Sequence, residues 1–147
     1  MEAIATWFHR FRQYFPRIYP RKVKSQFNTR GVILSIVSKH IIADIVSEDP
    51  KVLDDQAAIL EALTLAAKAA NATILRTVSH KFDPQGVTAF ILLAESHISI
   101  HTWPELNRAA VDIYTCGTHT DPESGLEALL SHLMAKCVTK QAIQRDT

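Results

Sequence analysis

Closely spaced strand patterns, interrupted by only two helical ones, constrain the fold of this chain most. β-Branched residues are frequent in residues 31–46, and such residues favour strands. Further strand patterns cover residues 73–82, 87–103, where we expect an interruption, and 109–117. Helices that are outnumbered by strands favour an antiparallel sheet with the helices packed on one face. We therefore expect an α+β fold, a two-layer α/β sandwich, whose open sheet face would favour a dimer.

The two helical patterns carry recognisable end signals. Residues 51–72 are rich in Ala and Leu and form an apolar stripe, and Asn71 is suited to end that helix. The second pattern covers residues 121–137, with Asp121 as the expected N-cap and Pro122 at the first helical position. We expect this second helix to close the domain.

Composition bounds the class of protein. A chain of 147 residues is long enough for one domain with a real core. Its hydrophobic content of 47% and charged content of 21% lie in the globular range. A formal net charge of +1 argues against general nucleic-acid binding. No apolar run has the length of a membrane span or the pattern of a signal peptide, so we expect a cytoplasmic protein.

The positive charge is concentrated near the N-terminus. Residues 1–30 are rich in Lys and Arg, with Glu2 as their acid, and their aromatic residues fall near helical spacing. This pattern fits a membrane-surface anchor, a targeting segment, a contact with an acidic partner, or an extension whose aromatics pack on the domain. Pro16 and Pro20 would stop any helix early. We expect a basic extension over residues 1–30 and a domain over residues 31–147.

The segment "LLAESHISIHTWPE", residues 92–105, holds an unusual density of polar and titratable side chains. It places a Glu-Ser pair inside a strand pattern and follows it with two His, a Trp and a second Glu. Such residues are seldom spent on core packing. Elsewhere, Cys116 and Cys137 show no framework spacing, so we expect free thiols, with Cys137 structural.

Together with "HKFDPQGVT" before it and "AAVDIYTCGTHTDP" after it, this segment resembles the prokaryotic S-adenosylmethionine decarboxylase proenzymes. These are small pyruvoyl-dependent enzymes of polyamine synthesis, and the resemblance covers residues 39–134. It implies that the chain cuts itself between Glu95 and Ser96. Ser96 would then become a pyruvoyl group, the cofactor that forms a Schiff base with the substrate. It also implies a homo-oligomer, a dimer of protomers that each consist of two fragments.

The resemblance assigns roles to neighbouring residues. His101 matches the proton acceptor of self-processing, a task that suits an imidazole. Thr88 lies where the family more often has Ser, whose hydroxyl stabilises the processing oxyanion. Cys116 matches the proton donor of turnover. The remaining matches concern substrate binding: Phe82 would stack on adenine, Glu105 would accept the ribose hydroxyls, and Trp103 would shape the same wall.

Strand geometry adds a condition to the role of His101. Ser96 and His101 are five residues apart, and an unbroken strand would place them on opposite faces. If His101 serves Ser96, the chain must turn or bulge between them, or Ser96 must lie just outside the regular strand.

The implied substrate is S-adenosylmethionine, and the implied product is its decarboxylated form, the aminopropyl donor for spermidine synthesis. Arg108 departs from the family pattern, and a cation beside the pocket would repel a sulfonium. An arginine or ornithine decarboxylase with the same pyruvoyl machinery is therefore the alternative. Phe82 and Glu105 favour S-adenosylmethionine, because an amino acid without adenosine would not need them.

Two hypotheses of other classes remain. A zinc protein could use His97, His101, Cys116 and His119 as ligands, but it would leave the Glu95–Ser96 pair unexplained, so we expect no metal. A relative that no longer cuts itself would be recognised by the loss of Ser96, His101 or Cys116, and all three are present.

Overall fold

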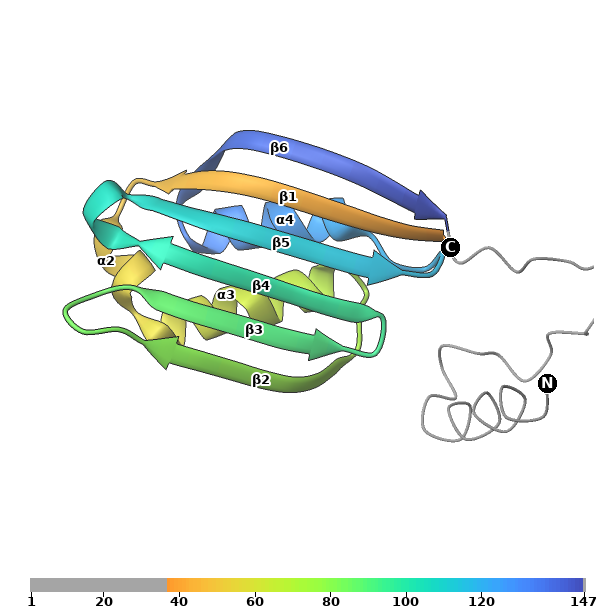
Figure 1. Cartoon of the computed structure of the whole chain (residues 1–147), viewed down its shortest axis with the longest axis horizontal. Helices are drawn as coiled ribbons and strands as arrows, with labels where there is room; N and C mark the ends of the chain where they lie inside the picture. The colour runs from red at the N-terminus through yellow and green to blue at the C-terminus, as the bar shows by residue number, and fades with distance from the viewer. Residues whose placement is uncertain (1–36, 147) are drawn as a thin grey trace, which may run out of the picture. The chain divides into compact units, whose positions relative to one another are not determined.

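The computed structural model describes residues 37–146, which form a six-stranded antiparallel sheet (Figure 1). The strands, in chain order, are β1 (Val37–Ser47), β2 (Ile74–Lys81), β3 (Val87–Leu93), β4 (Ser96–Trp103), β5 (Arg108–Cys116) and β6 (Ala135–Asp146). Their order in the sheet is β2-β3-β4-β5-β1-β6, so β2 and β6 form the edges. The predicted basic extension, residues 1–30, lies outside the described residues.

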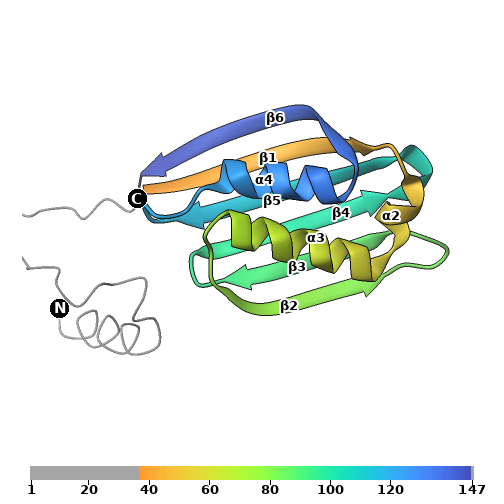
Figure 2. The same cartoon turned by 180° about the vertical axis from the view of Figure 1, so that it is seen from behind.

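Helices cover one face of this sheet. They are α2 (Pro50–Asp54), α3 (Gln56–Ala69) and α4 (Pro122–His132), and a short 3₁₀ turn, η1 (Pro104–Leu106), joins β4 to β5. Figure 2 shows α3 and α4 side by side across the same face of the sheet. The two-layer α+β sandwich expected from the sequence is confirmed.

The core lies between the helices and the inward face of the sheet. Alternate strand residues such as Ile45, Ile98 and Ile113 are fully buried there against Leu63 and Leu129 of the helices. On the opposite face, large apolar side chains remain partly exposed, namely Ile42, Leu92 and Ile143. Burying such surface stabilises by about 25 cal/mol per Å². The open face is therefore suited to contact with another protein surface.

Three aspartates cap the helices. The Asp121 carboxylate accepts hydrogen bonds from the backbone N–H groups of Glu123 and Ser124, which confirms the predicted N-cap of α4. Asn71 follows α3 with a φ of 54°, the left-handed conformation expected of a helix stop. Asp49 and Asp55 cap α2 and α3 in the same way as Asp121. Asp55 thereby divides the predicted helix over residues 51–72 into two.

The expectation of a helix over residues 121–137 was wrong at its C-terminal end. Helix α4 ends at His132, and Met134 takes a φ of 47°. The chain then enters β6, where Cys137 is exposed and pairs with Ile45 of β1. This segment pairs with β1 along nearly its whole length, so its backbone N–H and C=O groups are hydrogen-bonded in the sheet and not in a last helical turn.

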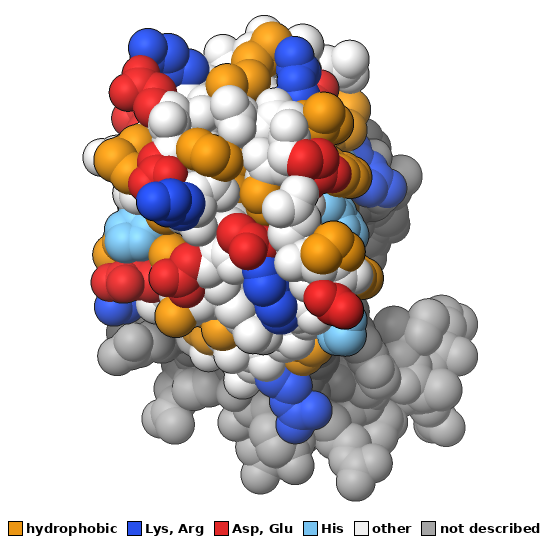
Figure 3. Space-filling model, turned by 90° about the vertical axis from the view of Figure 1, so that its left-hand side faces the viewer, with side chains coloured by type: hydrophobic (Ala, Val, Ile, Leu, Met, Phe, Trp, Pro, Cys, Tyr) orange, Lys and Arg blue, Asp and Glu red, His pale blue; other side chains and the backbone are white. Residues whose placement is uncertain are grey.

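The interruption predicted in the strand over residues 87–103 is a turn at Ala94 and Glu95, which joins β3 and β4 into a hairpin. At the end of the sheet that carries the β2–β3 loop, acidic, basic and apolar side chains are interspersed on the surface (Figure 3). Within residues 37–146, no helix has both the length and the apolar character needed to cross a membrane.

Candidate active site

The residues singled out from the sequence form two groups at opposite ends of the sheet. The β3–β4 turn and the last residue of β5 lie at one end, whereas the β2–β3 loop, the last residue of β4 and η1 lie at the other (Figure 1). We name the first group the Ser96 cluster; it comprises Glu95, Ser96, His97, Cys116 and His119. We name the second group the His101 cluster; it comprises Phe82, Thr88, His101, Trp103 and Glu105.

Ser96 is the first residue of β4 and has a strained backbone. Its φ is 148°, a value that residues with a side chain rarely adopt and that costs about 1–3 kcal/mol. Its hydroxyl oxygen lies 3.2 Å from Nδ1 of His97. The strained residue therefore adjoins the Glu95–Ser96 peptide bond, where the sequence analysis expects the chain to be cut.

The carbonyl group of Glu95 accepts two hydrogen bonds from one residue. The backbone N–H of Cys116 donates to it at 2.9 Å, and the Cys116 thiol donates at an Sγ–O distance of 2.9 Å. Two donors on one carbonyl oxygen polarise it and stabilise negative charge that develops there. Burial raises the pKa of the Cys116 thiol, and the negative charge of Glu95 raises it further, so the thiol keeps its proton at neutral pH.

The side chain of Glu95 is buried and held on both sides. The whole residue is only 4% exposed, and its Oε2 accepts a hydrogen bond of 2.8 Å from the backbone N–H of Thr73. Its Oε1 lies 3.4 Å from Nε2 of His119, and the carbonyl group of His119 accepts from the Asn71 side chain. These contacts fix the residue that supplies the polarised carbonyl. The sequence analysis gave His119 no such part.

His97 is the imidazole nearest to Ser96 among the contacts of the described residues. Its ring stacks on Phe90 with centroids 5.3 Å apart and makes a T-shaped contact with Tyr114 with centroids 5.8 Å apart. Burial lowers the pKa of His97, and the neighbouring His40 lowers it further. The sequence analysis treated His97 as a solvated or hydrogen-bonded residue, with a zinc ligand as the alternative, although its position next to Ser96 was a usable signal.

The His101 cluster lines one pocket. Thr88 and His101 face each other across the β3–β4 ladder, and a hydrogen bond of 2.8 Å joins Thr88 Oγ1 to His101 Nδ1. The pocket has a volume of about 350 Å³, within the range of small-molecule sites. It is lined by Phe82, Gln85, Gly86, Thr88, His101, Thr102, Trp103 and Glu105. The predicted substrate-binding residues are thus brought together, and Arg108 is not among the lining residues.

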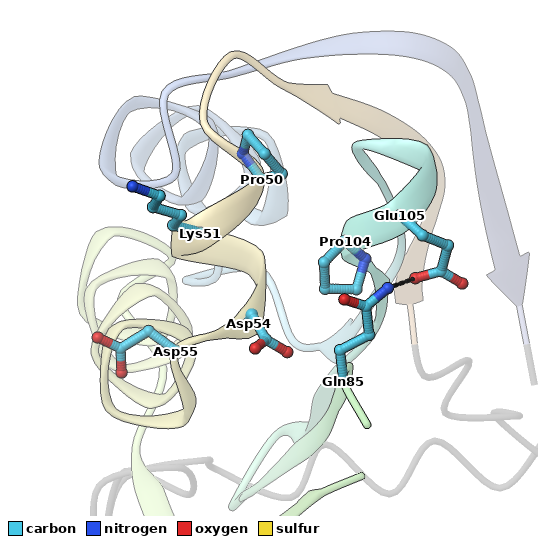
Figure 4. Close-up of a pocket in the computed structure, with 7 residues that line it drawn as sticks. All are labelled: Pro50, Lys51, Asp54, Asp55, Gln85, Pro104 and Glu105. Carbon is cyan, nitrogen blue, oxygen red and sulfur yellow. Dashed lines mark hydrogen bonds between the residues drawn. The ribbon is translucent and has the colours of Figure 1, made fainter. Parts of the chain in front are cut away.

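Glu105 is held by the β2–β3 loop. Gln85 of this loop donates a hydrogen bond of 3.0 Å to Glu105 Oε2, at the rim of a second pocket of about 420 Å³ (Figure 4). The loop is fastened in turn to α2, because Asp54 accepts from the Gly86 N–H at 2.7 Å and pairs with Lys81. The sequence analysis did not identify Gln85, whose role depends on this loop conformation.

The two clusters do not meet within one copy of the chain. Strand β4 runs from Ser96 to Trp103 without a register shift against either neighbour, which places His101 about 16 Å along the strand from Ser96 at roughly 3.3 Å per residue. The turn or bulge that His101 would need is therefore absent from β4. Likewise, no three His, Cys, Asp or Glu side chains of residues 37–146 lie close enough to hold a metal ion.

Comparisons with known proteins identify close relatives. Residues 39–146 match the family model described as S-adenosylmethionine decarboxylase. A protein of Parasynechococcus marenigrum named S-adenosylmethionine decarboxylase proenzyme is 49% identical over 112 residues, which cover 76% of this chain and 88% of that protein. One of the same name from Pyrobaculum neutrophilum is 45% identical over 109 residues, covering 74% and 88%. A crystal structure of the adenosylmethionine decarboxylase from Aquifex aeolicus is similar with a TM-score of 0.67 and 40% identity, covering 75% of this chain and 91% of that one.

Proposed function

Because the chain belongs to the S-adenosylmethionine decarboxylase family, we propose that it is a self-processing, pyruvoyl-dependent enzyme that decarboxylates S-adenosylmethionine. One observation carries this proposal above the others. The strained Ser96 follows a carbonyl group, that of Glu95, that is already polarised by two donors from Cys116. The proposed unit is the domain over residues 31–147, cut between positions 95 and 96.

The proposed self-cleavage has two stages. The hydroxyl oxygen of Ser96 attacks the carbonyl carbon of Glu95, and the amide becomes an ester while the Cys116 donors stabilise the oxyanion. Removal of the α-proton of Ser96 then expels Glu95 as a carboxylate, the new end of residues 1–95. The dehydroalanine left at position 96 tautomerises to an imine. Water hydrolyses this imine to the pyruvoyl group and releases ammonia.

A second copy of the chain completes the site. In a two-fold dimer, if one residue of the first copy contacts a second residue of the other copy, the same pair meets again with the copies exchanged. Packing two open sheet faces in this way would place His101 and Thr88 of one copy beside Ser96 of the other. The partly exposed apolar side chains on this face, such as Ile42 and Leu92, supply a surface for that contact.

The chain's own residues would then support turnover. When present, the pyruvoyl group supplies the electron sink for loss of carbon dioxide. The Cys116 thiol, held protonated, is suited to return a proton to the substrate α-carbon. Phe82 and Trp103 offer ring faces that attract the sulfonium, and Glu105 can accept both ribose hydroxyls.

The experiment that tests this proposal combines mass and activity. We expect intact-mass measurement of the purified protein to give two fragments, residues 1–95 and 96–147, and Ser96→Ala to give one uncut chain. Release of carbon dioxide is then measured with S-adenosylmethionine, arginine and ornithine. Activity confined to arginine or ornithine would favour the alternative substrates, and an uncut wild-type chain would contradict the proposal.

A further inference from the structure

Formation of the ester requires a base for the Ser96 hydroxyl, because a serine hydroxyl is a poor nucleophile at its ordinary pKa. We infer that His97 of the same chain is this base and accepts the hydroxyl proton at its Nδ1. The inference rests on the proposed self-cleavage and adds a catalytic residue to it. His101 of a second copy is then left with the later step, removal of the α-proton.

The contact between the two residues already has the required geometry. Ser96 Oγ lies 3.2 Å from His97 Nδ1, which is at the outer limit of hydrogen-bond reach for a general base. The imidazole ring is packed on two sides, stacked on Phe90 and in a T-shaped contact with Tyr114. Rings packed in this way restrict rotation of the imidazole, so its nitrogen stays directed at the hydroxyl.

The charges around His97 favour the neutral ring that a base must have. The Tyr114 ring of β5 contacts His97, and His40 of β1, which acts on its charge, is paired with Asp112 at 3.1 Å between Nε2 and Oδ1. Arg145 of β6 lies over the Tyr114 ring, 5.2 Å from its centroid. Burial and His40 lower the pKa of His97, and Asp112 raises it by less. The ring is therefore neutral at neutral pH, and with its proton on Nε2 the Nδ1 can accept the hydroxyl proton.

In this step His97 accepts one proton and later donates it again. The hydroxyl proton of Ser96 moves to Nδ1 as its Oγ bonds to the carbonyl carbon of Glu95. The bond between that carbon and the Ser96 nitrogen then breaks, and the imidazolium donates its proton to the departing nitrogen. His97 is neutral again once the ester has formed. Loss of His97 should stop the reaction before the ester, whereas loss of His101 should stop it after the ester.

Hydroxylamine distinguishes these two blocks, because it cleaves an ester at Glu95 but leaves the amide intact. His97→Phe keeps a ring between Phe90 and Tyr114 and removes the base, and His97→Asn keeps an acceptor that is not basic. His132→Asn, on the helix face of the sheet, is the matched control for loss of an imidazole. Cutting is followed by denaturing gel and intact mass after cell-free synthesis, and thermal midpoints report folding.

We expect wild type and His132→Asn to cut alike, and both His97 variants to cut at least about 100-fold more slowly, as loss of a general base predicts. The uncut His97 protein should resist hydroxylamine, whereas uncut His101→Phe should be cleaved by it. A folded His97→Phe protein that cuts at the wild-type rate, or that accumulates the hydroxylamine-sensitive ester, would overturn the inference.

His97→Ala provides a second measurement if neither larger side chain is accommodated. It leaves a space between Phe90 and Tyr114 that free imidazole can enter, so added imidazole should restore cutting. Folded His97→Ala that does not respond to imidazole would overturn the inference. Failure of the proposed function is seen separately, because the wild-type chain itself would then remain whole.

Discussion

A mixture of two inactive variants should regain self-cleavage if the Ser96 and His101 clusters of different copies form one site. Ser96→Ala removes the nucleophile and His101→Phe removes the distant imidazole. Neither variant alone should cut to completion. In a dimer that contains one chain of each kind, however, Ser96 of one chain faces His101 of the other, so one of the two sites is complete.

The expected amount of cutting follows from the structure. Ser96 and His101 are separated by about 16 Å along an unbroken strand, too far for direct proton transfer within one chain. Random assembly of equal amounts yields mixed dimers for about half of the chains. About half of the His101→Phe chains should therefore cut, and all Ser96→Ala chains should stay whole.

Co-expression followed by intact-mass analysis measures this directly, because the fragment from 96 to 147 carries the substitution at position 101. Each variant expressed alone, and the two mixed after purification, are the controls. If the co-expressed variants cut no more than each variant does alone, the two clusters do not cooperate between copies. If His101→Phe cuts fully by itself, the imidazole of His101 has no part in self-cleavage.

Three further changes probe the Ser96 cluster and the core. Cys116→Ala should still cut, since the backbone N–H of residue 116 still donates to Glu95, but carbon dioxide release should fall about 10²–10⁴-fold without the proton donor; an uncut chain would contradict this division. In uncut Ser96→Ala protein with Cys137→Ser, Glu95→Gln removes a charge that raises the pKa of the Cys116 thiol. The absorbance of the Cys116 thiolate should then appear at lower pH than with Glu95 present. A Cys116 titration at the same pH in both proteins would contradict the effect of Glu95 on this thiol. Gly125→Val should lower the free energy of unfolding by roughly 1–3 kcal/mol, because a Cβ there lies 3.0 Å from the Ala66 carbonyl oxygen; an unchanged thermal midpoint would exclude this clash.

Features that depend on near neighbours in the sequence were predicted well. Asp121 and Pro122 begin α4 as expected, and Asn71 follows the end of α3. These signals act within one or two turns of the chain. The end of α4 was missed, because residues 133–137 contain no helix breaker. Strand β6 forms instead by pairing with β1, whose residues are about 90 to 110 positions away in sequence.

The sequence singled out candidate site residues but not the side chains and backbone groups that contact them. Strand alternation supplied only a condition, that Ser96 and His101 lie on opposite faces if the strand is unbroken. It could not indicate that the φ of Ser96 turns its hydroxyl toward His97, because that conformation departs from regular strand geometry. Nor could it indicate that the carbonyl of Glu95 faces Cys116, a contact set by the β4–β5 register.

The strand order has a consequence for the two pieces that a cut at Glu95 would create. The N-terminal piece contributes β1, β2 and β3, and the C-terminal piece contributes β4, β5 and β6. Because β1 is inserted between β5 and β6, the pieces are interlocked through shared ladders. Parting them would require breaking open the sheet itself, so the nicked molecule keeps its architecture without a covalent bridge.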